Sequence, residues 1–169
     1  MLSILAAALL ATQQPPVDSG TIRIHLLGHA IGAERYALEN VAGRLVLTDT
    51  FTFTDRGGKI QLASSMQLSR AFEPVQLTSI GRTYRFVNVD ADVSVISGKV
   101  HSRSLGDTTT FTSPKHFFPI AAYAPLEAQA ILVRYWLGHG RPKTITIAPA
   151  DPTTEVSVED LGVAHIISQ

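Results

Sequence analysis

The segment from residue 45 to 68 constrains the fold most strongly, because apolar and polar side chains alternate along it on both sides of a turn signal. A β-strand directs successive side chains to opposite faces, so such alternation marks a strand with one buried face. The turn signal is Asp-Arg-Gly-Gly at 55–58, and threonines fill much of the other face of the first strand. The pattern predicts a β-hairpin that covers a core on one side and meets solvent on the other.

The same segment predicts the register of the two strands. A four-residue loop aligns the apolar positions of both strands, Phe53 with Ile60, Phe51 with Leu62 and Leu47 with Met66. It also aligns Asp49 with Ser64, the one polar residue on each apolar face. A slip of one residue would turn every side chain to the opposite face of the sheet. The apolar alternation and the Asp49–Ser64 pair agree on the same register, which supports it. Strands of this length must also twist and coil.

One helix is predicted in a chain whose other segments have strand patterns. Pro125 suits a first helical position, and Glu127 places a negative charge near the positive helix end. The chain then runs without Gly or Pro until Gly-His-Gly at 138–140, with Pro142 just beyond, which is a strong stop signal. We therefore expect a helix over about 125–137.

The expected helix is apolar nearly all round and holds the only tryptophan, Trp136. Such a helix is normally buried, so we expect it to pack into the concave face of a sheet. In the alternative interpretation, aromatic side chains of this region line a ligand cleft: Phe117, Phe118, Tyr135 and Trp136.

Further strands are expected at 21–28, 34–39, 75–80, 83–89, 93–96, 99–103, 108–112, 143–148, 154–158 and 163–167. Turns are expected between them, including turns at 28–32 and 90–92. Strands that follow one another through short turns imply an antiparallel sheet. The predicted fold is therefore mainly β: a coiled antiparallel sheet or half-open barrel of about 11–12 strands, wrapped around one helix.

The chain begins with an apolar run, Met-Leu-Ser-Ile-Leu-Ala-Ala-Ala-Leu-Leu-Ala-Thr, followed by a polar stretch with two prolines. This order is typical of a signal peptide, although the usual basic residue near the start is missing. A misassigned start codon and a buried first strand are the alternatives. We expect residues 1–13 to be a signal peptide, 14–20 a linker and 21–169 a single β domain, exported to the periplasm or beyond.

Charge and composition restrict the partners. Lys plus Arg number 14 and Asp plus Glu number 14, which argues against nucleic acid and anionic membrane surfaces as partners. The predicted helix is too short to span a bilayer, so no transmembrane span is expected in the mature chain. The chain has no cysteine, and so has neither disulfides nor thiolate chemistry.

No catalytic or metal-binding constellation is visible. None of the six histidines falls in a zinc-binding spacing, and no Gly-x-Ser-x-Gly or phosphate loop is present. Two pairs have side chains that bind metals, His25 with His29 and Asp90 with Asp92, and both pairs lie in expected turns. We expect no catalytic residue, no metal and no cofactor, and so no enzymatic activity from this chain by itself.

An ordered set of short motifs nevertheless resembles a known group of proteins. The set is Gly-Ala-Glu-Arg-Tyr at 32–36, Phe-Thr-Phe-Thr-Asp-Arg-Gly at 51–57, Phe-Phe-Pro-Ile at 117–120, Tyr-Ala-Pro at 123–125, Arg-Tyr-Trp at 134–136 and His-Gly-Arg-Pro at 139–142. It is similar to the β-rich, non-catalytic N-terminal region of exported bacterial amidohydrolases, over about residues 21–165. More distantly, the pattern resembles half-open β-barrels of the lipoprotein-carrier kind.

The resemblance implies a β module that works with a metal-dependent hydrolase, either a C-terminal or a separate amidohydrolase domain. The metal-binding histidines and lysine of such a domain are absent here, so no catalytic residue carries over. A final hairpin expected after the acidic strand is also missing, which implies a fragment, a short reading frame or a partner that completes the sheet.

Two alternative functions are therefore expected from the sequence. The first is the non-catalytic module of an exported amidohydrolase. The second is a periplasmic binding protein for a lipid-like apolar molecule held between sheet and helix. The candidate ligand-binding residues are Phe51, Phe53, Tyr84, Phe86, Phe117, Phe118, Tyr135 and Trp136.

Overall fold

The computed structural model describes residues 17–55, 57–83, 87–120, 124–149 and 154–162. Within these ranges the chain forms eleven strands and one helix. The large sheet contains β1 (Asp18–Leu26), β2 (His29–Val41), β3 (Arg44–Asp55), β4 (Gly58–Leu68), β5 (Pro74–Arg82), β6 (Asn88–Ile96), β7 (Lys99–Ser104) and β8 (Asp107–Thr112). The remaining elements are β9 (Phe117–Pro119), α1 (Leu126–Gly138), β10 (Ile145–Ala148) and β11 (Glu155–Val156).

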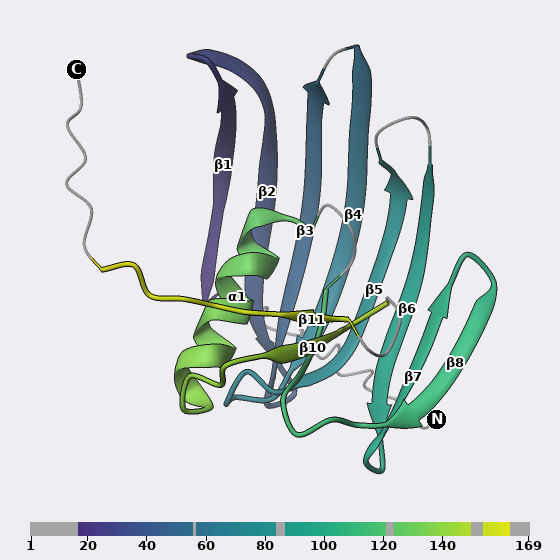
Figure 1. Cartoon of the computed structure of the whole chain (residues 1–169). Helices are drawn as coiled ribbons and strands as arrows, with labels where there is room; N and C mark the ends of the chain where they lie inside the picture. The colour runs from purple at the N-terminus through teal and green to yellow at the C-terminus, as the bar shows by residue number, and fades with distance from the viewer. Residues whose placement is uncertain (1–16, 56, 84–86, 121–123, 150–153, 163–169) are drawn as a thin grey trace, which may run out of the picture.

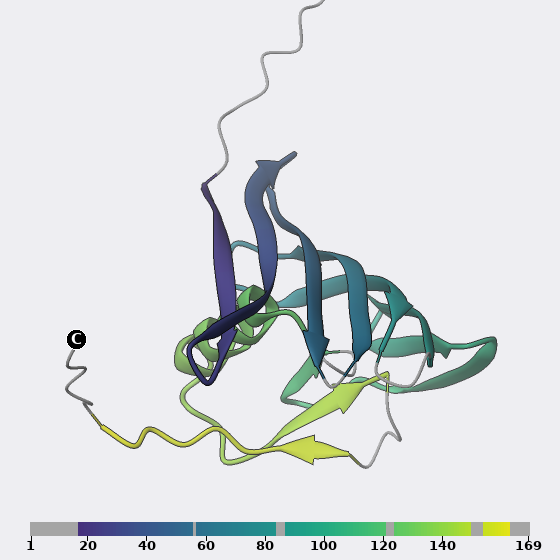
Figure 2. The ribbon, with the colours of Figure 1, turned by 90° about the horizontal axis from the view of Figure 1, so that it is seen from above.

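The large sheet is an antiparallel meander in which each strand pairs with its neighbours in sequence, in the order β1 to β8. It is not closed into a barrel. The second sheet has three strands in the order β11-β10-β9, and β9 and β10 run parallel with α1 connecting them. Figures 1 and 2 show the large sheet curving, with α1 and the small sheet on the same side of it. The predicted half-open sheet wrapped around one helix is confirmed.

The predicted hairpin register is also confirmed. Asp49 pairs with Ser64 and Phe51 with Leu62, and the strands continue as far as Asp55 opposite Gly58. The same register extends across the sheet as a row of buried apolar residues, Leu38, Leu47, Met66, Leu77 and Val93. This row forms the floor of the main core.

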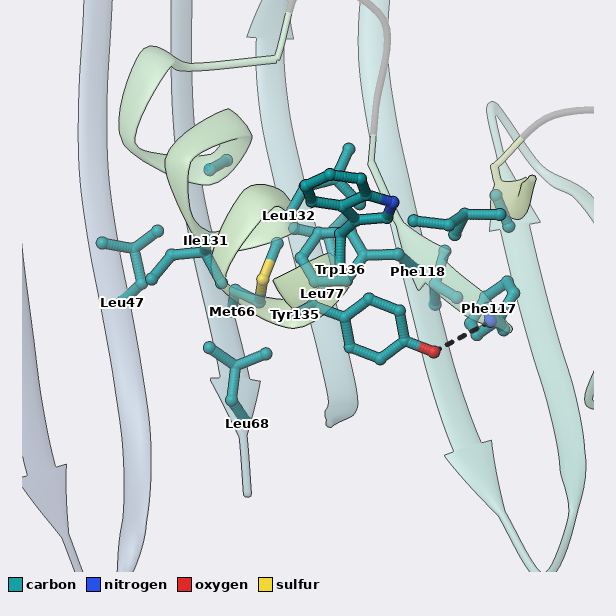
Figure 3. Packing of buried hydrophobic residues seen from close by; sticks show 14 of the residues in the cluster. Leu47, Met66, Leu68, Leu77, Phe117, Phe118, Ile131, Leu132, Tyr135 and Trp136 are labelled. Carbon is teal, nitrogen blue, oxygen red and sulfur yellow. Dashed lines mark hydrogen bonds between the residues drawn. The ribbon is translucent and has the colours of Figure 1, made fainter. Parts of the chain in front are cut away.

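The main core lies between this floor and the helix with its small sheet. The buried helix side chains are Ala128, Ile131, Leu132, Tyr135 and Trp136, and the small sheet adds Phe117, Phe118, Ile145 and Ala148. Figure 3 shows Ile131 and Trp136 directed towards the strands that carry Leu47 and Leu77. The burial of so many large apolar side chains supplies the main favourable free energy of this fold.

Although α1 is apolar nearly all round, only one side of it is buried. Leu126, Val133 and Leu137 are exposed, although they are as apolar as the residues on the buried side. A helix turns by about 100° per residue, so these positions share one face that points away from the sheet. Pro125 precedes the helix as its N-cap instead of being its first residue.

Two predicted turns are wrong. The 28–32 segment belongs almost entirely to β2, because the turn is made by Leu27 and Gly28 alone, which both adopt positive φ. Gly32 lies inside β2 for a packing reason, since a Cβ there would overlap the backbone oxygen of Thr52. The 90–92 segment lies within β6, where Asp90 pairs with Arg103 on the neighbouring strand.

Other differences are local. Of the strand expected at 83–89, residues 84–86 lie outside the described residues; Thr83 N–H donates to Val87 O at 2.8 Å, and β6 begins at Asn88. β9 was not predicted at all. β1 begins at Asp18, inside the segment predicted as a linker. The predicted signal peptide, residues 1–13, and the strand expected at 163–167 lie outside the described residues.

Candidate functional site

The aromatic residues predicted to bind a ligand fall into two separate groups. Phe117, Phe118, Tyr135 and Trp136 all join the main core and are buried. The backbone N–H of Phe117 donates to the hydroxyl of Tyr135 at 3.3 Å, which ties β9 to α1 (Figure 3). The indole N–H of Trp136 donates to Pro142 O at 3.0 Å. These four side chains therefore fill the space between helix and sheet.

Phe51 and Phe53 lie in a second apolar cluster. It contains Phe51, Ile60 and Leu62, with Ile24, Phe53 and Val89 packed against them. The two phenyl rings meet edge to face with centroids 5.2 Å apart, a favourable geometry. Tyr84 and Phe86 lie outside the described residues. The assignment of all eight residues to a ligand site stays a prediction.

A row of polar side chains separates the two clusters. Asp49, Ser64 and Ser79 lie opposite one another on β3, β4 and β5, one row along from the apolar floor. The hydroxyl oxygens of Ser64 and Ser79 are 3.2 Å apart and share a hydrogen bond. Asp49 and Ser79 are both buried. We call Asp49, Ser64 and Ser79 the polar row.

The N-terminus of α1 meets a carboxylate from the sheet. Glu34 on β2 is fully buried, and its Oε2 and Oε1 accept hydrogen bonds from the N–H groups of Leu126 at 2.5 Å and Glu127 at 2.9 Å. The first N–H groups of a helix have no partner within the helix and carry its positive end. Because no capping side chain comes from Pro125, Glu34 supplies the cap from a distant part of the chain.

A small cavity lies beneath this helix end. Its volume is about 10 Å³, and its lining consists of Asp49, Ser64, Met66, Leu77, Ser79, Ile120, Ala124, Pro125 and Ala128. Burial raises the pKa of Asp49 to about 7, with a further increase from the nearby charge of Glu34 and an opposing effect of the Ser64 hydroxyl. This cavity is too small for a lipid-like molecule.

A larger pocket of about 220 Å³ opens at the other end of α1. His139 is one of the residues that line it. Its ring stacks on Tyr135 with centroids 4.0 Å apart, and its Nδ1 lies 2.7 Å from Tyr135 O, an acceptor, so Nδ1 carries a hydrogen. Its Nε2 faces Glu73 Oε1 at 3.7 Å. Lys115 and Ser113 also line this pocket, so the pocket contains a cationic side chain and a hydroxyl group beside Glu73 and His139.

Neither pair weighed as metal ligands gathers further ligands in the described part of the chain. Asp90 Oδ2 accepts a hydrogen bond from Arg103 at 2.7 Å, and this contact lowers the pKa of Asp90. His25 and His29 are exposed beside the β1–β2 turn. Among the described residues, no group of three or more His, Cys, Asp or Glu side chains could hold a metal ion. No helix in the same ranges is long and apolar enough to cross a membrane.

Three features of this region were not predicted from the sequence: the cap by Glu34, the cavity and the His139 pocket. One signal was present for Glu34, because a charged residue occupies the same face of its strand as Tyr36 and Leu38. Comparisons with known proteins add no assignment, since no protein-family model, no curated protein and no solved structure matches the chain.

Proposed function

We propose that this chain is a non-catalytic β module that acts with an exported amidohydrolase domain. The proposal starts from the ordered motifs in the sequence that resemble such modules. The observation that supports it best is that residues of these separate motifs contact one another. One of these contacts holds α1 on the large sheet, and the others tie α1 to β9 and to the segment that follows the helix, so the motifs have a structural role.

Three contacts carry this argument. Glu34, from the first motif, accepts the N–H of Leu126, directly after the Tyr-Ala-Pro motif. Phe117 N–H donates to Tyr135, which joins the Phe-Phe-Pro-Ile and Arg-Tyr-Trp motifs. The indole of Trp136 donates to Pro142, which joins the last two motifs. Because these motif residues hold the elements of the module together, they support a module that folds and is recognised by a partner. The catalytic chemistry would then belong to the amidohydrolase domain.

The test combines the module with a partner barrel. The amidohydrolase barrel encoded in frame with, or next to, this chain would be expressed alone and together with the module. We expect the module alone to hydrolyse no amide with or without added zinc, and to comigrate with the barrel in size-exclusion chromatography. Hydrolysis by the isolated module, or two components that never comigrate, would contradict the proposal.

A second function, binding of a lipid-like apolar molecule, is favoured by the cluster around Phe51 and Phe53. This cluster lies beyond the polar row, and Phe53 is only partly buried. Lipid extraction followed by mass spectrometry of the purified protein tests it. A protein that copurifies with no apolar molecule, and takes up none from vesicles, would remove this alternative.

A further inference from the structure

One carboxyl oxygen of Asp49 is buried without a hydrogen-bond partner among the described residues. The residue is 5% exposed, and its side chain lines the cavity beneath the N-terminus of α1. Buried polar groups nearly always have partners, so an orphaned carboxyl oxygen calls for a physical explanation. Protonation of the carboxyl group is such an explanation, because the neutral form needs far less solvation than the carboxylate.

The surroundings of Asp49 contain no positive charge among the described residues that face it. On β2 it faces Tyr36 directly across the strand pair and lies near Glu34, a second carboxylate. On β4 and β5 its neighbours in the polar row are Ser64 and Ser79. From the helix side, the cavity lining contributes the apolar groups Ile120, Ala124, Pro125 and Ala128.

The carboxyl groups of Glu34 and Asp49 differ in the hydrogen-bond donors that can stabilise a negative charge on them. The Glu34 carboxylate accepts two N–H groups at the positive end of α1. Asp49 lacks such donors and sits beside that carboxylate, and two carboxylates that share a dry site favour a proton on one of them. The group left without helix N–H donors is the one that takes the proton. Burial and the charge of Glu34 accordingly raise the pKa of Asp49 to about 7.

We infer that Asp49 is a proton-binding site that couples pH to the docking of α1 on the large sheet. With the proton bound, the neutral carboxyl group fits the dry space under Pro125 and Ala128. When the proton leaves for solvent, two carboxylates face each other beneath the helix end. The contact that must then loosen is the one between the polar row and the first turn of α1. This inference is independent of the proposed function.

The direction of the pH effect follows from proton counting. An unfolded aspartate loses its proton near pH 4, whereas folded Asp49 keeps it to about 7. Between these values the folded state holds one more proton, so stability falls as pH rises. The unfolding equilibrium constant should increase by up to tenfold per pH unit in this interval and level off above it.

The first test compares wild type with Asp49→Asn, which keeps the shape but cannot titrate. Urea unfolding would be measured from pH 4.5 to 8.5. We expect the stability of the wild type to fall towards pH 7 and that of Asp49→Asn to lack this fall. Asp90→Asn is the matched control, because the Asp90 side chain is about half exposed and paired with Arg103, so this variant should keep the wild-type slope. Equal slopes in wild type and Asp49→Asn would overturn the inference.

Two measurements on the wild type keep the inference testable if Asp49→Asn does not fold. Carboxyl carbon chemical shifts in NMR should report a midpoint near 7 for Asp49, and a midpoint near 4 would overturn the proton site. Hydrogen-exchange protection of the Leu126 and Glu127 amides should fall above pH 7. Protection that stays constant through that range would overturn the coupling to helix docking.

Discussion

The carboxylate of Glu34 caps a helix that begins 92 residues later, at Leu126. Local caps come from the residue just before a helix, but α1 is preceded by Pro125, which has no side chain able to cap it. The contact therefore does two jobs: it satisfies the first N–H groups of α1 and fixes the helix on β2. It also places the positive helix end against a buried negative charge.

Glu34→Ala should destabilise the domain by about 2–4 kcal/mol, because it leaves two helix N–H groups without acceptors. Glu34→Gln keeps one acceptor oxygen and should lose less. Glu39→Ala, on the opposite face of the same strand, is the matched control and should stay within about 0.5 kcal/mol of wild type. Urea denaturation followed by circular dichroism measures all three. A Glu34→Ala variant as stable as the control would show that the cap is unimportant.

Trp136→Ala should bring the domain close to unfolding. The side chain is 7% exposed and packs in the main core, and removal of such a residue costs about 3–5 kcal/mol against a typical total of about 5–15. Leu137→Ala, at the neighbouring exposed position, is the control. Because Trp136 is the only tryptophan, unfolding must be followed by circular dichroism. A loss below about 1.5 kcal/mol would instead favour an open ligand groove beside Trp136.

Gly32→Ala should destabilise the sheet by about 1–3 kcal/mol or more, because overpacking forces the backbone to move. The added methyl group would overlap the backbone of Thr52 and Phe53 on β3. Gly138→Ala is a matched control, since nothing lies near the position of its Cβ at the end of α1. Thermal unfolding of both variants decides the matter, and equal midpoints would argue against close packing at Gly32.

Chelation should leave the fold unchanged. The described residues contain no cluster of three or more ligating side chains, and the Asp90 carboxylate is engaged by Arg103. The thermal midpoint should be the same before and after treatment with EDTA. A lower midpoint after chelation would reopen the His25–His29 and Asp90–Asp92 interpretations.

Export should remove the first twelve or thirteen residues, given the apolar run and the polar, proline-containing stretch after it. Intact mass of protein recovered from outside the cytoplasm measures this. A mature chain that still contains Met1 would count against a cleaved signal peptide.

The sequence predicted the register of the β3–β4 hairpin correctly, because two independent patterns, apolar alternation and the Asp49–Ser64 pair, agree on it; Asp55 and Gly58, expected in the loop, pair with each other instead. It failed at 90–92, where two aspartates imitate a turn although Ala91 faces the core and Asp90 pairs across the strands. Acidic residues on the outer face of a strand carry no strand signal of their own.

β9 and the Glu34 cap were missed for a common reason. β9 is three residues long and pairs with β10 only after the chain has passed through α1. Glu34 and Leu126 are likewise distant in sequence, so no local pattern marks their contact. Of the predicted ligand-binding aromatics, four gather in the main core and two in the second cluster, because the polar row intervenes between them. Sequence periodicity shows which side chains share a face, but not how far along the strand each one lies from the helix.

The order of strands in the large sheet has a consequence for how the chain folds. Each strand pairs with its neighbour in sequence, so the sheet grows by successive local hairpins with little loss of chain entropy at each step. Its apolar floor is complete by Val93, yet its cover, α1 and β10, is not synthesised until residue 148. During that interval the growing chain exposes an apolar surface to solvent, and chaperones bind surfaces of this kind. We therefore expect the docking of α1 against Glu34 to end the exposure of this surface.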